Sequence, residues 1–115
     1  MENSMQPNFT YPKQELIDAF HIMYDYFPEA VMLVHKSKKI AAVNPVAAIQ
    51  GREPGKLCAL HGTPDLHMGC LAHDAMEEQK TQCKAVNYDG RNLELYWLPV
   101  DGYPDYFIHF ALNKQ

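Results

Sequence analysis

Five residues of types that bind metals in proteins lie close together in the middle of the chain, at Cys58, His61, His67, Cys70 and His73. Two residues separate Cys58 from His61, and two separate His67 from Cys70. A cysteine and a histidine at this spacing can both reach one ion, and two such pairs complete the tetrahedral site that zinc prefers. The pattern predicts a metal site formed by Cys58, His61, His67 and Cys70, holding zinc or another transition metal.

These residues also have explanations that need no metal. The linker between the two pairs is shorter than the roughly 12 residues usual between zinc-binding pairs, and free cysteines, among them Cys83 on a predicted strand, often simply pack. Haem is a second candidate cofactor, because it needs one axial histidine in an apolar pocket. The helix histidines His67 and His73 are candidates for that ligand, and the strand histidines His35 and His109 are weaker ones.

Catalytic patterns are weaker than the metal pattern. Nucleophilic catalysis needs a thiol or hydroxyl held against a base and an orienting third group. Cys70 lies near two histidines, but no third member can be named. Gly51 and Gly55 are too sparse for a phosphate-binding loop. We therefore expect a protein that is not an enzyme, with a thiol enzyme using Cys70 as the competing hypothesis.

Length and charge narrow the functional class. The chain has 115 residues and a formal net charge of −4, which fits one domain and lacks the basic stripe of a nucleic-acid binder. No apolar run approaches the ~20 residues needed to span a membrane, and residues 1–13 do not form a secretory signal. Three cysteines, an odd number, favour reduced thiols. We expect a cytoplasmic protein without membrane or nucleic-acid partners.

An amphipathic helix is predicted over residues 13–27, after a flexible polar tail over residues 1–12. Apolar residues at spacings of three and four form one stripe on this helix: Leu16, Ile17, Phe20, Met23, Tyr24 and Phe27. The stripe either packs on its own domain or forms a dimer contact.

Two strands are predicted next, over residues 30–35 and 40–43. Asn44 initiates a turn, Pro45 fits the first position of a short helix, and Gly51 ends it. A longer helix over residues 64–80 would carry His67 and Cys70 on one face.

Three strands follow, over residues 82–88, 92–98 and 106–112. Asp89-Gly90 is a two-residue hairpin turn, and a longer turn contains Asp101-Gly102 and Pro104. The elements together predict an α+β fold, in which a five-stranded antiparallel sheet carries short helices and one longer helix on one face.

This element order and the residues 40–56 resemble the PAS domain family. The strand that ends in Val43-Asn44, the small pair Ala47-Ala48, Gly51 and then Gly55-Lys56 are similar to the PAS pattern, in which the second strand leads through an Asn into a short helix and a Gly. We assign residues 28–113 to a PAS-like domain. The resemblance implies a non-catalytic sensory and ligand-binding module in signal transduction, acting as a homodimer or on a signalling partner protein.

The resemblance also bears on the cofactor. Some PAS domains carry a Cys, a His-Gly and a Cys-x2-Cys in this region, and Cys58, His61-Gly62 and Cys70 are similar to them. His67 replaces one thiolate of that pattern, so an iron–sulfur cluster fits less well than zinc. FMN is not expected, because the cysteine motif of flavin photosensors has no counterpart here. The competing function is a metal- or haem-binding redox sensor that uses the cluster from Cys58 to His73.

A small-molecule ligand between sheet and helices would meet one of two sets of side chains. The sheet turns inward either Leu93, Leu95 and Trp97 or Tyr96, Leu98 and Val100. Both sets predict a ligand that is mostly apolar or aromatic, and the sequence leaves the choice open.

Overall fold

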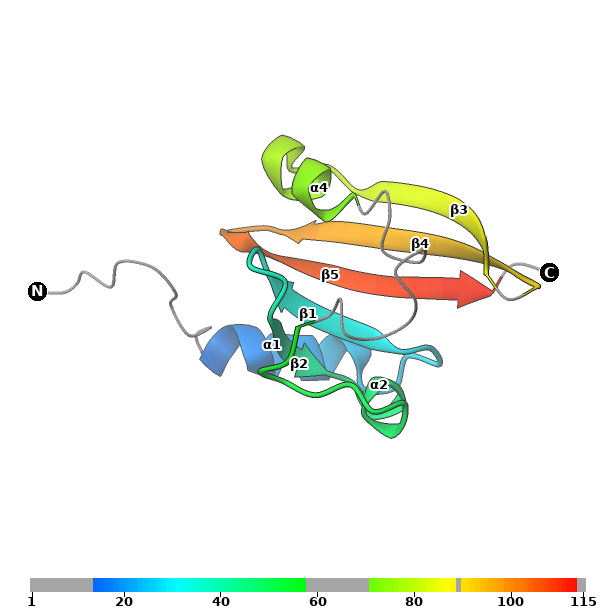
Figure 1. Ribbon diagram of the computed structural model, residues 1–115. Coiled ribbons are helices and arrows are strands. Elements are labelled where there is room, and N and C mark those ends of the chain that lie inside the picture. The colour runs from blue at the N-terminus through cyan, green and yellow to red at the C-terminus, as the bar shows by residue number, and fades with distance from the viewer. Residues whose placement is uncertain (1–13, 58–70, 89, 114–115) are drawn as a thin grey trace, which may run out of the picture.

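The fold is known from a computed structural model that describes residues 14–57, 71–88 and 90–113. The predicted metal ligands Cys58, His61, His67 and Cys70 lie outside the described residues, as does the first part, residues 64–70, of the helix predicted over residues 64–80. The described residues form, in chain order (Figure 1), α1 (Gln14–Tyr24), β1 (Val31–His35), β2 (Ile40–Val43), α2 (Pro45–Ile49), α4 (Ala72–Glu78), β3 (Gln82–Tyr88), β4 (Arg91–Val100) and β5 (Tyr103–Asn113).

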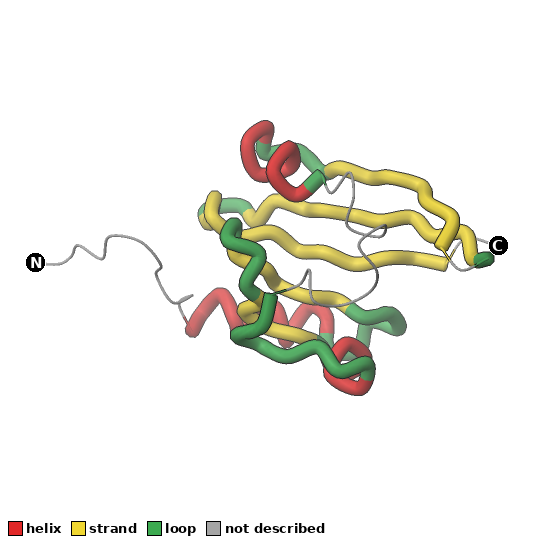
Figure 2. The backbone as a smooth tube through the Cα atoms, in the orientation of Figure 1, coloured by secondary structure: helices red, strands yellow, loops and turns green. Residues whose placement is uncertain are grey.

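The strands form one sheet in the order β2-β1-β5-β4-β3, and Figure 2 shows the helices at its margins and faces. All neighbouring strands are antiparallel. The predicted α+β fold with a five-stranded antiparallel sheet is confirmed. Among the described residues, no helix is both long and apolar enough to cross a bilayer.

The sheet is apolar on both faces, because successive side chains of a strand point to opposite sides. The inner face packs against α2 and α4, and its buried cluster comprises Met32, Val34, Ile40, Ala47, Ala72, Ala75, Leu93, Leu95, Trp97 and Phe107. The outer face packs against α1, and its buried cluster comprises Leu16, Phe20, Val31, Leu33, Ala42, Tyr106 and Ile108. The amphipathic helix therefore lies across the sheet from the other two helices.

The apolar stripe of α1 packs on its own sheet, which was one of the two readings of the sequence. Leu16 and Phe20 are buried, and Tyr24 is partly buried against the same cluster. These three residues follow one another at intervals of four, which places them in one row along the helix. Met23 was predicted to belong to this stripe, and that prediction is wrong: its side chain is 69% exposed, because it lies on the flank of the row.

Asn44 joins four separate segments through one buried side chain. Its Oδ1 accepts hydrogen bonds from the backbone N–H groups of Val31 and Ala47, each at 3.0 Å. Its Nδ2 donates to the carbonyl oxygens of Tyr24, at 3.1 Å, and Glu29, at 2.9 Å. The predicted turn and helix cap are confirmed, and the same side chain also fastens the end of α1 to the start of β1.

The β4–β5 hairpin differs from the sequence prediction. Asp101-Gly102 forms the whole turn, with Val100 paired to Tyr103 and Gly102 at a φ of +84°. The longer turn that included Pro104 is wrong, because Pro104 lies inside β5. An irregularity in the ladder follows, between Pro99 and Val100, and proline is tolerated in a strand where a regular ladder bond is not needed.

Candidate functional site

The inner sheet face carries the set Leu93, Leu95 and Trp97. All three side chains are buried in the inner cluster, whereas Leu98 and Val100 pack against the outer cluster on the side of α1. The choice that the sequence left open is therefore settled in favour of the set that contains Trp97. This indole is the only one in the chain.

His109 lies directly opposite Trp97 and stacks on it. The two rings have centroids 5.1 Å apart and an interplanar angle of 16°, and the residues pair across the β4–β5 ladder. His109 Nδ1 lies 2.8 Å from the carbonyl oxygen of Tyr96. A carbonyl only accepts, so Nδ1 carries the proton and the neutral ring has its lone pair at Nε2. Met32 flanks His109 on the other side, across the β1–β5 ladder.

The same inner face becomes polar toward the edge strand β3. Gln82 lies opposite Trp97, and Lys84 lies opposite Leu95. Both polar side chains are half-buried, and Gln82 donates to Glu78 of α4 over 3.2 Å. The inner face therefore combines an aromatic and aliphatic floor with an imidazole at its centre and an ammonium group toward one edge. Such a combination of apolar walls and few polar groups is typical of small-molecule sites.

His35, a weaker candidate for a haem ligand from the sequence, makes structural contacts with Ser37 and Tyr106. Its Nδ1 accepts from the Ser37 backbone N–H at 3.1 Å and lies 2.9 Å from the Ser37 hydroxyl. Its ring meets Tyr106 edge-on, with centroids 5.1 Å apart. Burial lowers the pKa of His35, and Lys36 and Lys39 lower it further, while Asp105 raises it. These contacts hold the β1–β2 turn.

The remaining cofactor candidates do not come together in the described part of the chain. His73 of α4 is 79% exposed and lies 3.4 Å from Glu77. Within residues 14–57, 71–88 and 90–113, no group of three or more metal-ligating side chains could hold an ion. The predicted ligands Cys58, His61, His67 and Cys70 fall outside these ranges, so the metal site stays a prediction.

Cys83 was expected to pack, and that expectation is wrong, because its thiol is exposed. It lies on the outer side of β3, opposite Tyr96. Hydrogen bonds with the Cys83 thiol and with Glu94 raise the pKa of Tyr96 to about 12. The Tyr96 ring stacks on Phe110 with centroids 5.1 Å apart. This side of the sheet is therefore a polar and aromatic surface beyond α1.

From the sequence, His109 is only a weaker candidate for a haem ligand, and its pairing with Trp97 is not predicted. A regular two-residue hairpin with Val100 opposite Tyr103 would place Tyr106 across from Trp97. The irregularity between Pro99 and Val100 shifts the ladder and places His109 there instead. Pro104 was the available signal, because proline within a strand marks an edge or a bulge.

Comparisons with known proteins agree on the fold. No protein-family model matches the sequence, and no curated protein matches it. A domain of an HTR-like protein from Haloarcula marismortui matches with a TM-score of 0.63 and 20% identity, over 76% of this chain and 99% of that domain. The photoactive yellow protein domain of the sensor histidine kinase Ppr from Rhodospirillum centenum matches with a TM-score of 0.58 and 18% identity, over 84% and 96% of the two chains.

The PAS domain of BvgS from Bordetella pertussis covers 87% of this chain and 83% of its own, at a TM-score of 0.47 and 12% identity. The first two matches span nearly the full length of the solved domains. These matches agree with the strand order of the sheet and with the position of Asn44 at the start of α2. The chain folds as a PAS-like domain.

Proposed function

We propose that this protein is a non-catalytic sensory module of signal transduction that binds a small molecule on its inner sheet face. The observation that carries the proposal is the stacked pair of Trp97 and His109 in the middle of an otherwise apolar surface. The two stacked rings form a flat aromatic patch in the layer between the sheet and the helices α2 and α4, and flat aromatic groups pack well on such a patch. We infer a ligand with a planar, mostly apolar body, and we place the protein in the cytoplasm on the evidence of its sequence.

The experiment uses freshly purified, untagged protein. Native mass spectrometry and absorbance spectra identify a carried-over metabolite, haem or metal together. Because Trp97 is the single tryptophan, its fluorescence reports binding at this face directly. We expect a bound or re-added planar compound to change that emission, and His109→Ala to weaken the response at least about tenfold.

The matched control for that variant is His73→Ala, since His73 is exposed on α4. Equal responses in the two variants, or no emission change with any compound released from the protein, would contradict the inner-face site. The absence of a ligand with an intact fold would leave a module that acts by protein contacts alone.

The second candidate function is a metal- or haem-binding redox sensor that uses Cys58, His61, His67 and Cys70. Its support is the spacing of these residues, since thiolates and imidazoles together suit zinc or a similar ion. Elemental analysis should find one metal equivalent in the untagged protein and a loss of most of it in Cys70→Ser. Metal far below one equivalent in both would exclude the site. A haem version predicts a visible absorption band that disappears on replacing one histidine.

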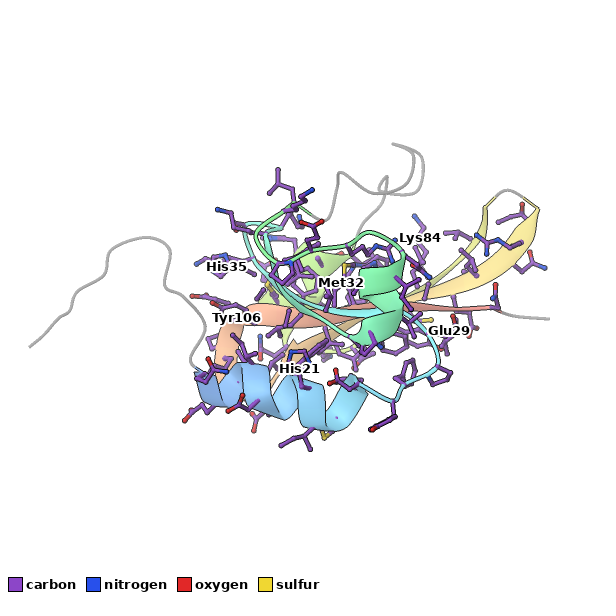
Figure 3. The ribbon with its side chains drawn as sticks, turned by 90° about the horizontal axis from the view of Figure 1, so that it is seen from below. His21, Glu29, Met32, His35, Lys84 and Tyr106 are labelled. Atoms are coloured by element: carbon purple, nitrogen blue, oxygen red, sulfur yellow. The ribbon has the colours of Figure 1, made fainter. Side chains whose placement is uncertain are left out.

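Output from the sensor requires a protein contact, and we propose that α1 provides it. The sequence favours a homodimer, and it also allows a separate signalling partner. Figure 3 shows α1 along one face of the sheet, with side chains directed toward the sheet and away from it. Light scattering at high micromolar concentration tests self-association, and a mass of one chain at all concentrations would refute the homodimer.

A further inference from the structure

The solvent side of α1 carries a second apolar stripe that no part of the described chain covers. Its members are Ala19, Ile22 and Met23 of α1, at the spacing of neighbouring turns, and Tyr26 in the turn that follows the helix. The side chains of Ile22, Met23 and Tyr26 are 82%, 69% and 100% exposed. The other large apolar side chains that are exposed in the described residues are Ile49 and Leu57. Neither of them belongs to a comparable stripe. We call Ala19, Ile22, Met23 and Tyr26 the exposed α1 stripe.

Acidic residues border this stripe. Asp18 lies one turn before Ile22 on the same side of α1, and Asp25 is the first residue after the helix. Asp18 is exposed and accepts from Gln14 Nε2 at 2.9 Å, and Asp25 lies 2.7 Å from His21 Nδ1. The segment from residue 14 to residue 35 contains no lysine or arginine. The lysines and arginines of the described residues lie instead in the β1–β2 turn, the segment after α2, and the region from Lys80 to Arg91.

This charge distribution bears on which of two partners binds the exposed α1 stripe, a second copy of the chain or a different protein. If a second copy packed through its own α1, it would bring another Asp18 and Asp25 and no lysine or arginine from that segment. Like charges across an interface oppose association, whereas complementary charges speed encounter and fix the register. A partner with basic residues beside its own apolar stripe would meet both features of this surface.

We propose that the exposed α1 stripe binds an amphipathic helix of another protein, which has a basic flank. Helices recognise such surfaces through apolar side chains repeated at neighbouring turns, and the charged border then selects among them. Tyrosine and methionine are enriched at the centre of interfaces of this kind. The inference rests on the proposed signalling function and specifies its partner, and it is independent of whether a ligand binds the inner face.

The test uses two synthetic helical peptides with identical leucine stripes, one with lysine flanks and one with glutamate flanks. Fluorescence anisotropy gives the affinities for the full chain, and amide chemical shifts show where each peptide binds. We expect the lysine peptide to shift the α1 resonances and to bind about tenfold tighter than the glutamate peptide. Added salt should reduce that difference, because it screens exposed charges.

Variants locate the contact. Ile22→Glu should lower the affinity for the lysine peptide about 30-fold, as for the centre of an interface. Ile49→Glu is the matched control, since Ile49 is 86% exposed on α2, and it should leave the affinity unchanged. Asp18→Lys should weaken the lysine peptide roughly 3- to 10-fold and strengthen the glutamate peptide, while Asp74→Lys on α4 should do neither.

Three results would overturn the proposal. These are equal affinity for both peptides, no α1 shifts with the lysine peptide, and self-association that Ile22→Glu abolishes while neither peptide binds. The last result would establish the homodimer and leave the signalling function intact. Conversely, a failure of every compound to change Trp97 emission would refute the ligand site without affecting the peptide measurements.

Discussion

Asn44 is the residue on which the relative placement of several elements depends. Its side-chain amide makes four hydrogen bonds to the backbone: Oδ1 accepts two of them, and Nδ2 donates the other two. The side chain is fully buried. A side chain that removes these groups leaves buried backbone N–H and C=O groups unpaired, and each such group costs about 1–3 kcal/mol.

We expect Asn44→Ala to lower the free energy of unfolding by about 3 kcal/mol or more. Urea denaturation followed by circular dichroism measures it. The control is Asn92→Ala, because Asn92 is exposed and its Oδ1 accepts an exposed hydrogen bond from Asn87 Nδ2 at 3.0 Å. Its loss should change stability by less than about 0.5 kcal/mol. Similar midpoints for the two variants would show that Asn44 does not have this role.

His35 gives the stability a pH dependence. Its folded-state pKa lies below the ordinary value of 6.5, first because of burial. Between these two pKa values the unfolded chain binds more protons than the folded chain, so stability falls as the pH falls through this range. Protonation would also place a proton on Nδ1, which accepts from the Ser37 N–H.

We therefore expect the urea midpoint to be higher at pH 7.5 than at pH 5, and His35→Gln to flatten that dependence. The comparison variant is His73→Gln, since His73 is exposed, and it should keep the slope of the native protein. A slope that His35→Gln leaves unchanged would assign the pH dependence to other groups.

At the scale of single elements, α1 combines two surfaces with different roles. Phe20 is 3% exposed and belongs to the outer cluster, where its ring lies 5.5 Å from that of Tyr24. Ile22, two residues later, is 82% exposed. The helix is therefore held to the sheet by one row of side chains and presents the other row to solvent.

Phe20→Ala should lower the free energy of unfolding by about 3–5 kcal/mol, the usual result for an aromatic residue removed from a core. Ile22→Ala should change it by less than about 0.5 kcal/mol, because an exposed side chain loses little burial. Thermal or urea unfolding of the two variants makes the comparison. Equal losses would mean that Ile22 is buried against something in solution, and a mass measurement would then identify a second copy.

The elements could be predicted where local chemistry determines them. The short helix after Asn44-Pro45 and the edge strands β2 and β3 follow directly from capping, proline geometry and β-forming residues. Register could not be predicted, because the irregularity beside Pro99 depends on how β5 accommodates Pro104 against β4. The placement of α1 on the face opposite α2 and α4 is also a tertiary result, since both sheet faces of β1 are apolar and either would accept an amphipathic helix.

At the scale of the whole molecule, β5 is the element that the two faces share. It lies between β1 and β4 in the middle of the sheet. Its Phe107 belongs to the inner cluster and its Tyr106 and Ile108 to the outer one. The candidate ligand contact His109 is on the same strand as Phe110, which packs toward α1. A change in the tilt of β5 would thus alter the side-chain packing on both faces of the sheet.

Native-state hydrogen exchange should rank the strands accordingly. We expect the amides of β5 to exchange slowest, because the strand is paired on both sides and covered on both faces, and to open only with global unfolding. Amides of β3, an edge strand with exposed Cys83 and Ala85, should exchange orders of magnitude faster. Equal protection in the two strands would mean that the edge of β3 is covered in solution.

The central position of the last strand has a consequence for how the chain is made. All five residues of β1 pair with β5, and within the sheet this ladder joins the β1–β2 hairpin to the β4–β5 hairpin. Ribosomes add about 5–20 residues per second. After β1 and β2 have been synthesised, it therefore takes on the order of seconds until β5, the strand that pairs with β1, leaves the ribosome. During that interval Val31, Leu33 and Val34 of β1, which are buried in the folded sheet, are exposed in the cell. We therefore expect nascent chains to depend on chaperones more than the folded protein does.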